Sequence, residues 1–201
     1  MKNIHSRNQG KRHIPEQAAK FFDDLLYKSF HEICNTSHKK FDFQVAKTTL
    51  KELKALEWQS IMLTIASSNF RLVSLVHFPP YKKLNQDYTA LLDEHAESDR
   101  KYKDFISETG NNLCGVACNI LATRTFSTGL STPTLIENLD TVHNIRLIDI
   151  DYETHVCGMQ NGSHQLCASF YVFKDSTFVF DERMKQLDFE IEKNTGELEF
   201  F

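Results

Sequence analysis

A long amphipathic helix is the feature that most constrains the fold of this chain. Between residues 98 and 125, mostly apolar side chains recur at steps of three and four, the spacing that lines one face of an α-helix. They belong to Tyr102, Phe105, Ile106, Thr109, Leu113 and Val116. Because burying an apolar face stabilises a fold, the rest of the chain is expected to supply a surface that covers this face.

Strand-like segments on both sides of the helix are candidates for that surface. Residues 58–66 and 70–78 are rich in β-branched and aromatic residues, and Ser67-Ser68-Asn69 between them is a turn signal. This pattern predicts an antiparallel hairpin. Short extended segments are expected at 41–45 and 134–136, a turn-rich connection at 127–133, and further strands at 145–156, 165–174 and 177–181.

Two other helices are predicted. Pro15 lacks the N–H that a helix start leaves unpaired, and apolar residues recur from there to near Asn35, which indicates an amphipathic helix. A shorter helix is expected over 83–95. Residues 1–14 are polar and basic and predict a flexible arm before a single domain over 15–201. The order of helices and strands is that of an α+β sheet with helices packed against it.

Composition and charge exclude several classes of function. The chain has 201 residues, enough for one domain, and a net charge of -4. Basic residues do not gather in a folded segment, so a nucleic-acid binder is not expected. No apolar run is long enough to span a membrane, and the N-terminus lacks the apolar region of a signal peptide. The five cysteines are therefore expected to be reduced thiols in the cytoplasm: Cys34, Cys114, Cys118, Cys157 and Cys167.

A polar stripe lies on the long helix opposite its apolar face, because each residue turns the helix by about 100°. Its members are Asp104, Glu108, Asn111 and Gly115, extended by Cys118 and Asn119. A glycine inside a helix costs about 1 kcal/mol relative to alanine, and close approach of a partner surface would explain Gly110 and Gly115. The stripe is then a flat docking face from which a carboxylate and an amide project.

That pair of groups suits hydrolysis of a phosphoryl group on a partner protein. The transition state of phosphoryl transfer is loose, so catalysis depends mainly on positioning a water in line and on electrostatics. An amide can accept a hydrogen bond from such a water and donate another nearby. A carboxylate can pair with a cation on the partner. The chain would need neither a nucleophile nor metal ligands of its own.

The motif Asp104-x3-Glu108-x2-Asn111-x3-Gly115, followed by Pro133, resembles that of the CheC/CheX/FliY phosphatases of bacterial chemotaxis. The interval between Asn111 and Pro133 is one residue shorter than in the family's pattern. A single motif of this kind is similar to CheX, whereas CheC carries two.

The resemblance extends over roughly residues 55–181. Residues 130–136 are similar to the segment in which the family's strand follows its active-site helix, and the hairpin and the later strands fall in the family's order. The fold implied is a CheC/CheX-like antiparallel sheet with helices packed on one face.

The function implied by the resemblance is hydrolysis of the aspartyl phosphate of a CheY-like receiver domain, the response-regulator part of two-component signalling. Glu108 would form a salt bridge with the receiver's lysine, and Asn111 would orient the attacking water. The other stripe residues would contact the receiver: Asp104, Gly115, Cys118 and Asn119. No cofactor is expected on this chain, since Mg²⁺ would belong to the receiver. A homodimer that joins sheet edges is implied as well.

Two alternatives remain within this resemblance. Asn112 is a second amide beside the stripe, although the helical wheel favours Asn111, which shares the stripe with Glu108. The same fold could also bind a receiver without hydrolysing its phosphate. The joint presence of Glu108 and Asn111 favours catalysis.

A cysteine peptidase is an alternative outside the family. Cys114-Gly115 after Gly110-Asn111-Asn112 resembles the nucleophile turn of papain-like enzymes, and His164 and Asp175 could complete the site. This interpretation requires a helix that begins at Cys114, where the helix dipole would lower the pKa of the thiol. A helix that begins near residue 98 excludes it.

A metal site is a further alternative, with Cys114 and Cys118 on one side of a helix and His155 and Cys157 on one face of a strand. Free cysteine more often acts as a small buried hydrophobe. Three other histidines are assigned to the surface or to strand ends: His77, His143 and His164.

Overall fold

The structure of the protein is a computed structural model. It describes residues 14–56, 58–84, 97–136, 150–160 and 163–176, and in addition residues 89, 92, 178, 179 and 184. Residues 1–13, most of the helix predicted over 83–95, and residues 137–149, which include His143, lie outside the described residues.

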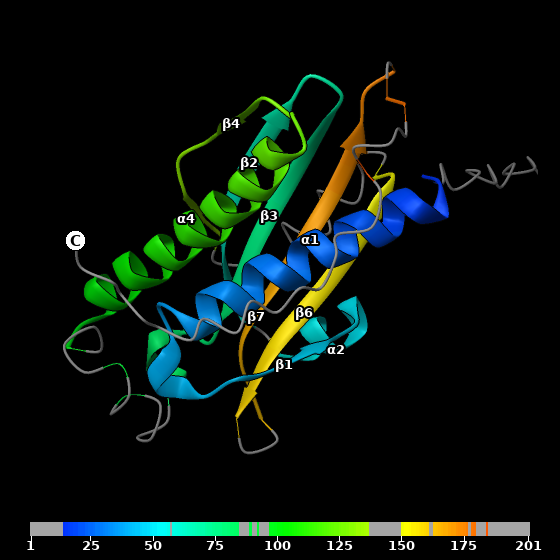
Figure 1. Cartoon of the computed structure of the whole chain (residues 1–201). Coiled ribbons are helices and arrows are strands. Elements are labelled where there is room, and N and C mark those ends of the chain that lie inside the picture. The colour runs from blue at the N-terminus through cyan, green and yellow to red at the C-terminus, as the bar shows by residue number, and fades with distance from the viewer. Residues whose placement is uncertain are drawn as a thin grey trace, which may run out of the picture.

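One antiparallel sheet forms the body of the described structure (Figure 1). Its strands follow the order β1-β6-β7-β3-β2-β4, and β5 also pairs with β2, beyond β4 along the same side. The strands are β1 (Gln44–Lys47), β2 (Gln59–Ser67), β3 (Phe70–Phe78), β4 (Thr128–Leu130), β5 (Thr134–Ile136), β6 (Tyr152–Gln160) and β7 (Ser163–Lys174). The predicted hairpin is confirmed as β2 and β3, which pair from Gln59↔Phe78 to Ala66↔Arg71.

Two long helices cross the same face of this sheet (Figure 1). The helices are α1 (Glu16–Asn35), the short α2 (Leu50–Ala55) and α4 (Asp99–Thr123), with single 3-10 turns η1 (Lys39–Phe41) and η2 (Tyr81–Lys83). Pro15 stands at the N-cap of α1, as its missing N–H favours. At the start of α4, Ser98 Oγ accepts a hydrogen bond from the Lys101 N–H, which satisfies one of the unpaired donors of the first turn.

The main core lies between these helices and the inner face of the sheet, the face turned toward α1 and α4. Alternate residues of each strand point to this face. Among them, Leu63, Leu72 and Phe170 are fully buried together with Phe22 and Leu113 of the helices. The implied fold, an antiparallel sheet with helices on one face, is therefore the observed one.

The outer face of the sheet, turned away from α1 and α4, is apolar as well. Val73, Leu75, Tyr171 and Phe173 form one buried cluster there. A second cluster contains Leu53 of α2, Trp58, Cys157 and Cys167. The segment from α2 to the start of β2 therefore covers one part of the outer face.

Several local predictions differ from the structure. Ile14 was assigned to the arm but is buried in the core. The segment 127–133 contains the short strand β4, because β2 offers it a free edge. Phe178 and Val179, within the strand predicted over 177–181, are not in a strand.

The prediction of five reduced thiols is wrong for two of them. Cys157 and Cys167 form a disulfide with a Cα–Cα distance of 4.1 Å. The pairing of β6 with β7 sets these two residues directly opposite each other. Register between strands, rather than cysteine spacing, decides this contact.

The assignment of His77 to the surface or a strand end is confirmed for the strand end, because His77 is the next-to-last residue of β3, but it is wrong for the surface. His77 is buried on β3, where its ring lies between Ser60 Oγ and Ser169 Oγ at 2.8 Å each. His155 Nδ1 is 2.8 Å from the same Ser169 hydroxyl. Burial lowers the pKa of His77 to about 3. A neutral imidazole thus links β2, β3, β7 and β6 through two serine hydroxyls.

Acidification should weaken this fold, because two buried imidazoles stay neutral in it. Burial lowers the pKa of His38 to about 4 and that of His77 to about 3, whereas both return to about 6.5 in the unfolded chain. Below about pH 6.5 the unfolded chain therefore binds protons that the folded chain does not. The unfolding free energy should fall by about 1.4 kcal/mol per pH unit for each histidine.

Urea unfolding between about pH 7 and pH 5 measures this slope. His38→Phe is the informative variant, because the ring of His38 already lies among those of Phe41, Phe43 and Phe105. This variant should reduce the dependence of the unfolding free energy on pH by about 1.4 kcal/mol per pH unit, the contribution of one proton. Equal slopes for the variant and the original chain would contradict the prediction.

Candidate functional site

The candidate site lies on α4, which is one unbroken helix from Asp99 to Thr123 (Figure 1). It continues through Gly110-Asn111-Asn112, the run where a break would favour the peptidase interpretation. The predicted apolar face is confirmed, with Tyr102, Ile106 and Leu113 fully buried. The polar stripe therefore stands on a rigid element whose other side is anchored in the core.

Gly110 brings α4 close to the sheet. A Cβ at this position would lie 2.8 Å from Leu63 Cδ1 and 3.4 Å from Ile61 Cγ2. The close approach expected at Gly110 is thus made to β2 and not to a partner protein, which corrects the hypothesis for this residue. At Gly115 a Cβ would meet no atom within 4 Å, so this position on the stripe is open to another molecule.

The two glycines should respond in opposite ways to alanine. Gly115→Ala should raise the unfolding free energy by up to about 1 kcal/mol, because alanine is the better helix former. Gly110→Ala should lower it by about 1 kcal/mol, because overpacking against the buried Leu63 outweighs that gain. Urea unfolding of both variants measures the difference. Equal stabilisation by both would show that Leu63 turns aside without cost.

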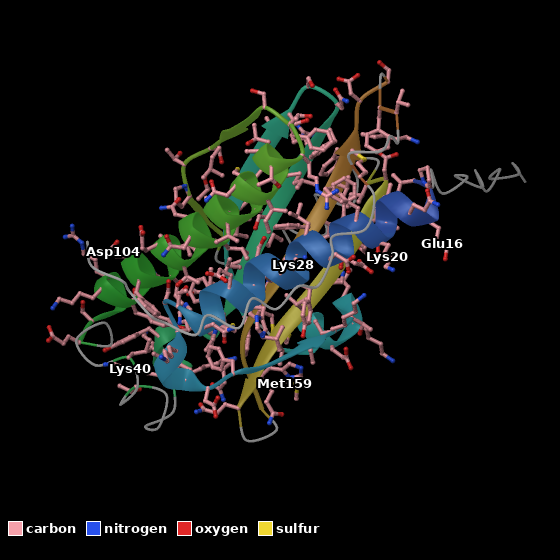
Figure 2. The ribbon with its side chains drawn as sticks, in the orientation of Figure 1. Glu16, Lys20, Lys28, Lys40, Asp104 and Met159 are labelled. Carbon is pink, nitrogen blue, oxygen red and sulfur yellow. A yellow bond between two sulfur atoms is a disulfide. The ribbon has the colours of Figure 1, made fainter. Side chains whose placement is uncertain are left out.

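The stripe residues differ in exposure. Asp104, Glu108 and Asn119 are exposed, whereas Asn111, Gly115 and Cys118 are half-buried. Asp104, labelled in Figure 2, keeps 75% of its side chain exposed, and Arg100 Nε approaches it only to 4.0 Å. Cys118 packs partly against the core.

Glu108 and Asn111 are available for a ligand. Within the described part of the chain, neither side chain takes part in a hydrogen bond or an ion pair. They lie three residues apart, so they are neighbours on the helix surface. A solvated carboxylate and a neighbouring amide are thus presented together from a fixed backbone.

The neighbours of α4 show where each amide stands. Phe105 faces the ring of His38, just beyond the end of α1, at a centroid distance of 5.1 Å. Asn112 follows Phe105 by seven residues, close to two helical turns, so it lies on the flank toward α1. Asn111 lies on the other flank with Gly115 and Cys118, and Glu108 stands between the two amides.

His38 and Thr109 support this part of the helix. The Thr109 hydroxyl donates a hydrogen bond to the Phe105 carbonyl at 3.0 Å, so it accepts one from His38 Nε2–H at 3.0 Å. Burial lowers the pKa of His38 to about 4, so the ring is neutral at pH 7 and carries its proton on Nε2. This contact ties α4, one residue after Glu108, to the segment that follows α1. Sequence reasoning missed it, because the partners are 71 positions apart.

The structure excludes Cys114 as a peptidase nucleophile. The residue lies in the middle of α4 and is fully buried. Burial raises the pKa of its thiol to about 12, the opposite of what a nucleophilic cysteine needs. His164, the proposed base, lies on β7, whereas Cys114 lies in the core beneath α4.

The metal alternative fails for a related reason. Cys157 is bonded to Cys167 on the outer face of the sheet, whereas Cys114 is in the core beneath the inner face. The described residues contain no group of three or more His, Cys, Asp or Glu side chains that could hold a metal ion. Within the same ranges, no helix combines the length and apolarity needed to cross a bilayer.

A second Glu-x2-Asn pair stands at the end of α1. Glu32 and Asn35 are both exposed there, and the spacing in the sequence could have revealed them. The Asn35 amide nitrogen lies 3.0 Å from His31 Nδ1, so this amide is already engaged. The pair offers an internal comparison for the one on α4.

Comparison with known proteins supports the fold at low sequence identity. No family model and no curated protein matches the sequence. A chain of the CheX-CheY-BeF3-Mg²⁺ complex from Borrelia burgdorferi is similar at a TM-score of 0.52 with 11% identity, over 78% of this chain and 99% of that one.

Two further structures are similar in the same way. A CheC-like chemotactic protein from Shewanella oneidensis MR-1 has a TM-score of 0.53 and 12% identity, over 77% of this chain and 99% of that one. The chemotaxis protein CheX from Vibrio vulnificus has a TM-score of 0.54 and 14% identity, over 78% of this chain and 98% of that one. This chain therefore has the fold of CheX and CheC-like proteins.

Proposed function

We propose that this chain is a protein phosphatase that hydrolyses the aspartyl phosphate of a CheY-like receiver domain. The observation that carries the proposal is the pair of unengaged groups, Glu108 and Asn111, on the unbroken α4. Supporting it is the shared fold with CheX, one structure of which is a complex with CheY, BeF3 and Mg²⁺. The receiver would bring the phosphoryl group and its Mg²⁺.

In this proposal Asn111 positions the attacking water. Its amide oxygen accepts a hydrogen bond from the water, and its NH2 group donates to an oxygen of the phosphoryl group or of the receiver. Because the transition state is loose, a water held in line supplies much of the rate enhancement. The anchored backbone of α4 suits this role, since positioning weakens when the supporting element moves.

Glu108 fixes the orientation of the complex. Its exposed carboxylate would pair with the lysine of the receiver, and the open surface at Gly115 lets the receiver approach the helix backbone. Asp104 and Asn119, which are also exposed, would lie at the rim of this contact together with the half-buried Cys118.

Release of inorganic phosphate from a phosphorylated receiver tests the catalytic role of Asn111. The substrate is a CheY-like receiver charged by a small phosphoryl donor in Mg²⁺. Asn111→Ala should lower kcat by about 100-fold, because the water is no longer held. Asn112→Ala is the matched control, an amide on the other flank of the same helix, and should stay within about twofold.

Each other outcome has a definite meaning. No acceleration by the original chain would reject the phosphatase. Binding of the phosphorylated receiver without acceleration would identify a non-catalytic receiver-binding module. Loss of activity in Asn112→Ala, with Asn111→Ala unaffected, would move the water-positioning role to Asn112.

Glu108→Gln separates orientation from chemistry. Loss of the ion pair should reduce kcat/KM by about tenfold, mostly through a higher KM. The dependence of kcat/KM on salt concentration should become weaker as well, because salt screens the interaction between exposed charges. Glu32→Gln on α1 is the matched control and should leave both quantities unchanged. A change confined to kcat would contradict the orienting role.

We also infer which edge of the sheet a homodimer would use. The edge beyond β2 is interrupted between β4 and β5 by Ser131, Thr132 and Pro133, and proline blunts an edge strand. The edge at β1 is short but continuous from Gln44 to Lys47. A dimer would therefore join β1 to its copy. Light scattering in solution tests whether the dimer forms, and a monomer at all concentrations would reject it.

A further inference from the structure

The outer face of the sheet carries a cysteine pair that the proposed hydrolysis does not use. Cys157 on β6 and Cys167 on β7 are directly opposite, disulfide-bonded and at most 1% exposed. We propose that they form a reversible thiol–disulfide couple, which exchanges with a low-molecular-weight thiol such as glutathione when α2 opens above them.

The fold can hold both states of the pair. β6 and β7 pair from Tyr152↔Val172 to Gln160↔Ser163, with one register shift between Gly158 and Met159. On the inner face, Val156 and Ala168, one residue from each cysteine, are buried in the main core. The hairpin therefore does not depend on the S–S bond, and after reduction the two thiols remain opposite each other, ready to close again.

The cover over the pair is small. Leu53 of α2 and Trp58 pack with the two cysteines, and Leu56 and Met159 border this cluster. α2 has six residues, and isolated helices of that length are marginal in water. It is held by a capping box between Thr49 and Glu52 at the surface, by this apolar contact, and by one hydrogen bond from the Thr48 N–H to the His155 carbonyl of β6. Such a segment opens locally at a lower free energy than the sheet unfolds.

The other three cysteines do not compete for this exchange. Cys34 lies on α1, and Cys114 and Cys118 lie on α4, across the sheet from the pair. Burial raises the pKa of Cys34 and Cys114 to about 12, and a thiol reacts as its thiolate. Cys118 is half-buried and lies on the helix side of the sheet. Disulfide exchange within the chain is therefore confined to Cys157 and Cys167.

The reaction is ordinary thiol–disulfide exchange. A glutathione thiolate attacks one sulfur, the S–S bond breaks, and the other cysteine leaves as a thiolate that takes a proton from water. A second glutathione thiolate attacks the mixed disulfide and releases the first cysteine, which is protonated in turn. Two glutathione molecules become glutathione disulfide, and the pair gains two electrons and two protons. Oxidation by glutathione disulfide is the reverse.

Trp58 supplies a reporter of the redox state. It is the only tryptophan of the chain and packs in the same cluster as the two cysteines. A disulfide in contact with an excited indole quenches its emission by accepting an electron, and a dithiol does so less. Reduction should therefore increase the tryptophan emission of the native protein.

The test equilibrates the full chain in glutathione buffers of increasing reduced-to-oxidised ratio, without denaturant. Tryptophan emission is recorded, and parallel samples are acid-quenched, unfolded, alkylated and weighed by mass spectrometry. Alkylated cysteines should rise from three to five of the five in the chain. Both readouts should follow one two-electron curve, approached equally from the oxidised and the reduced side.

Two variants make the result specific. The double variant Cys157→Ser with Cys167→Ser should show constant emission and three alkylated cysteines in every buffer. Leu53→Ala, which thins the cover, should accelerate reduction severalfold. Leu130→Ala is its control, an exposed leucine on β4, and should leave the rate unchanged.

Three results would overturn the proposal. Reduction only under conditions that unfold the chain would make the disulfide purely structural. Five alkylated cysteines in every buffer would show that the pair does not close. Equal reduction rates for Leu53→Ala and the original chain would reject α2 as the cover. None of these experiments contains a receiver domain, so their results neither support nor contradict the proposed phosphatase activity.

Discussion

The contact of α4 with β2 at Gly110 is the interaction on which the rest of the structure depends. Only a residue without a side chain lets the helix lie so near Leu63, and this distance sets how the apolar face of α4 enters the core. The contact of His38 with Thr109 then fixes the helix against the end of α1. Glu108 and Asn111 are presented on the opposite side as a consequence of packing.

The sheet separates two kinds of chemistry. On the helix side, exposed polar groups stand on a rigid support, as the proposed positioning of a water requires. On the other side, strand register brings cysteines and histidines into contact in a buried layer. Cys157, Cys167, His77 and Ser60 lie at the same level across four neighbouring strands. Both ring nitrogens of His77 lie within hydrogen-bond distance of serine hydroxyls of this layer, which suits a neutral and dry interior.

The pattern of apolar and polar residues predicted the secondary structure of segments whose conformation depends mainly on their own sequence. The apolar periodicity of α1 and α4 and the β-rich runs of β2 and β3 identified these elements, and the wheel of α4 identified the stripe. The same pattern did not predict burial or contacts that depend on segments distant in the sequence. The helix predicted from residue 98 already argued against Cys114 as a nucleophile, but only the structure showed that this thiol is buried. The burial of His77 could not be predicted before β3 was seen between β2 and β7.

By itself, the sequence determined the two long helices, the central hairpin, the α+β class and the candidate pair Glu108 and Asn111. These follow from the spacing of apolar and polar residues along one segment. Only the tertiary structure showed that Gly110 packs against β2, that His38 is hydrogen-bonded to α4, and that Cys157 forms a disulfide with Cys167. Each of these contacts joins residues through the register of strands or the approach of a helix to a sheet, and neither is encoded in local periodicity.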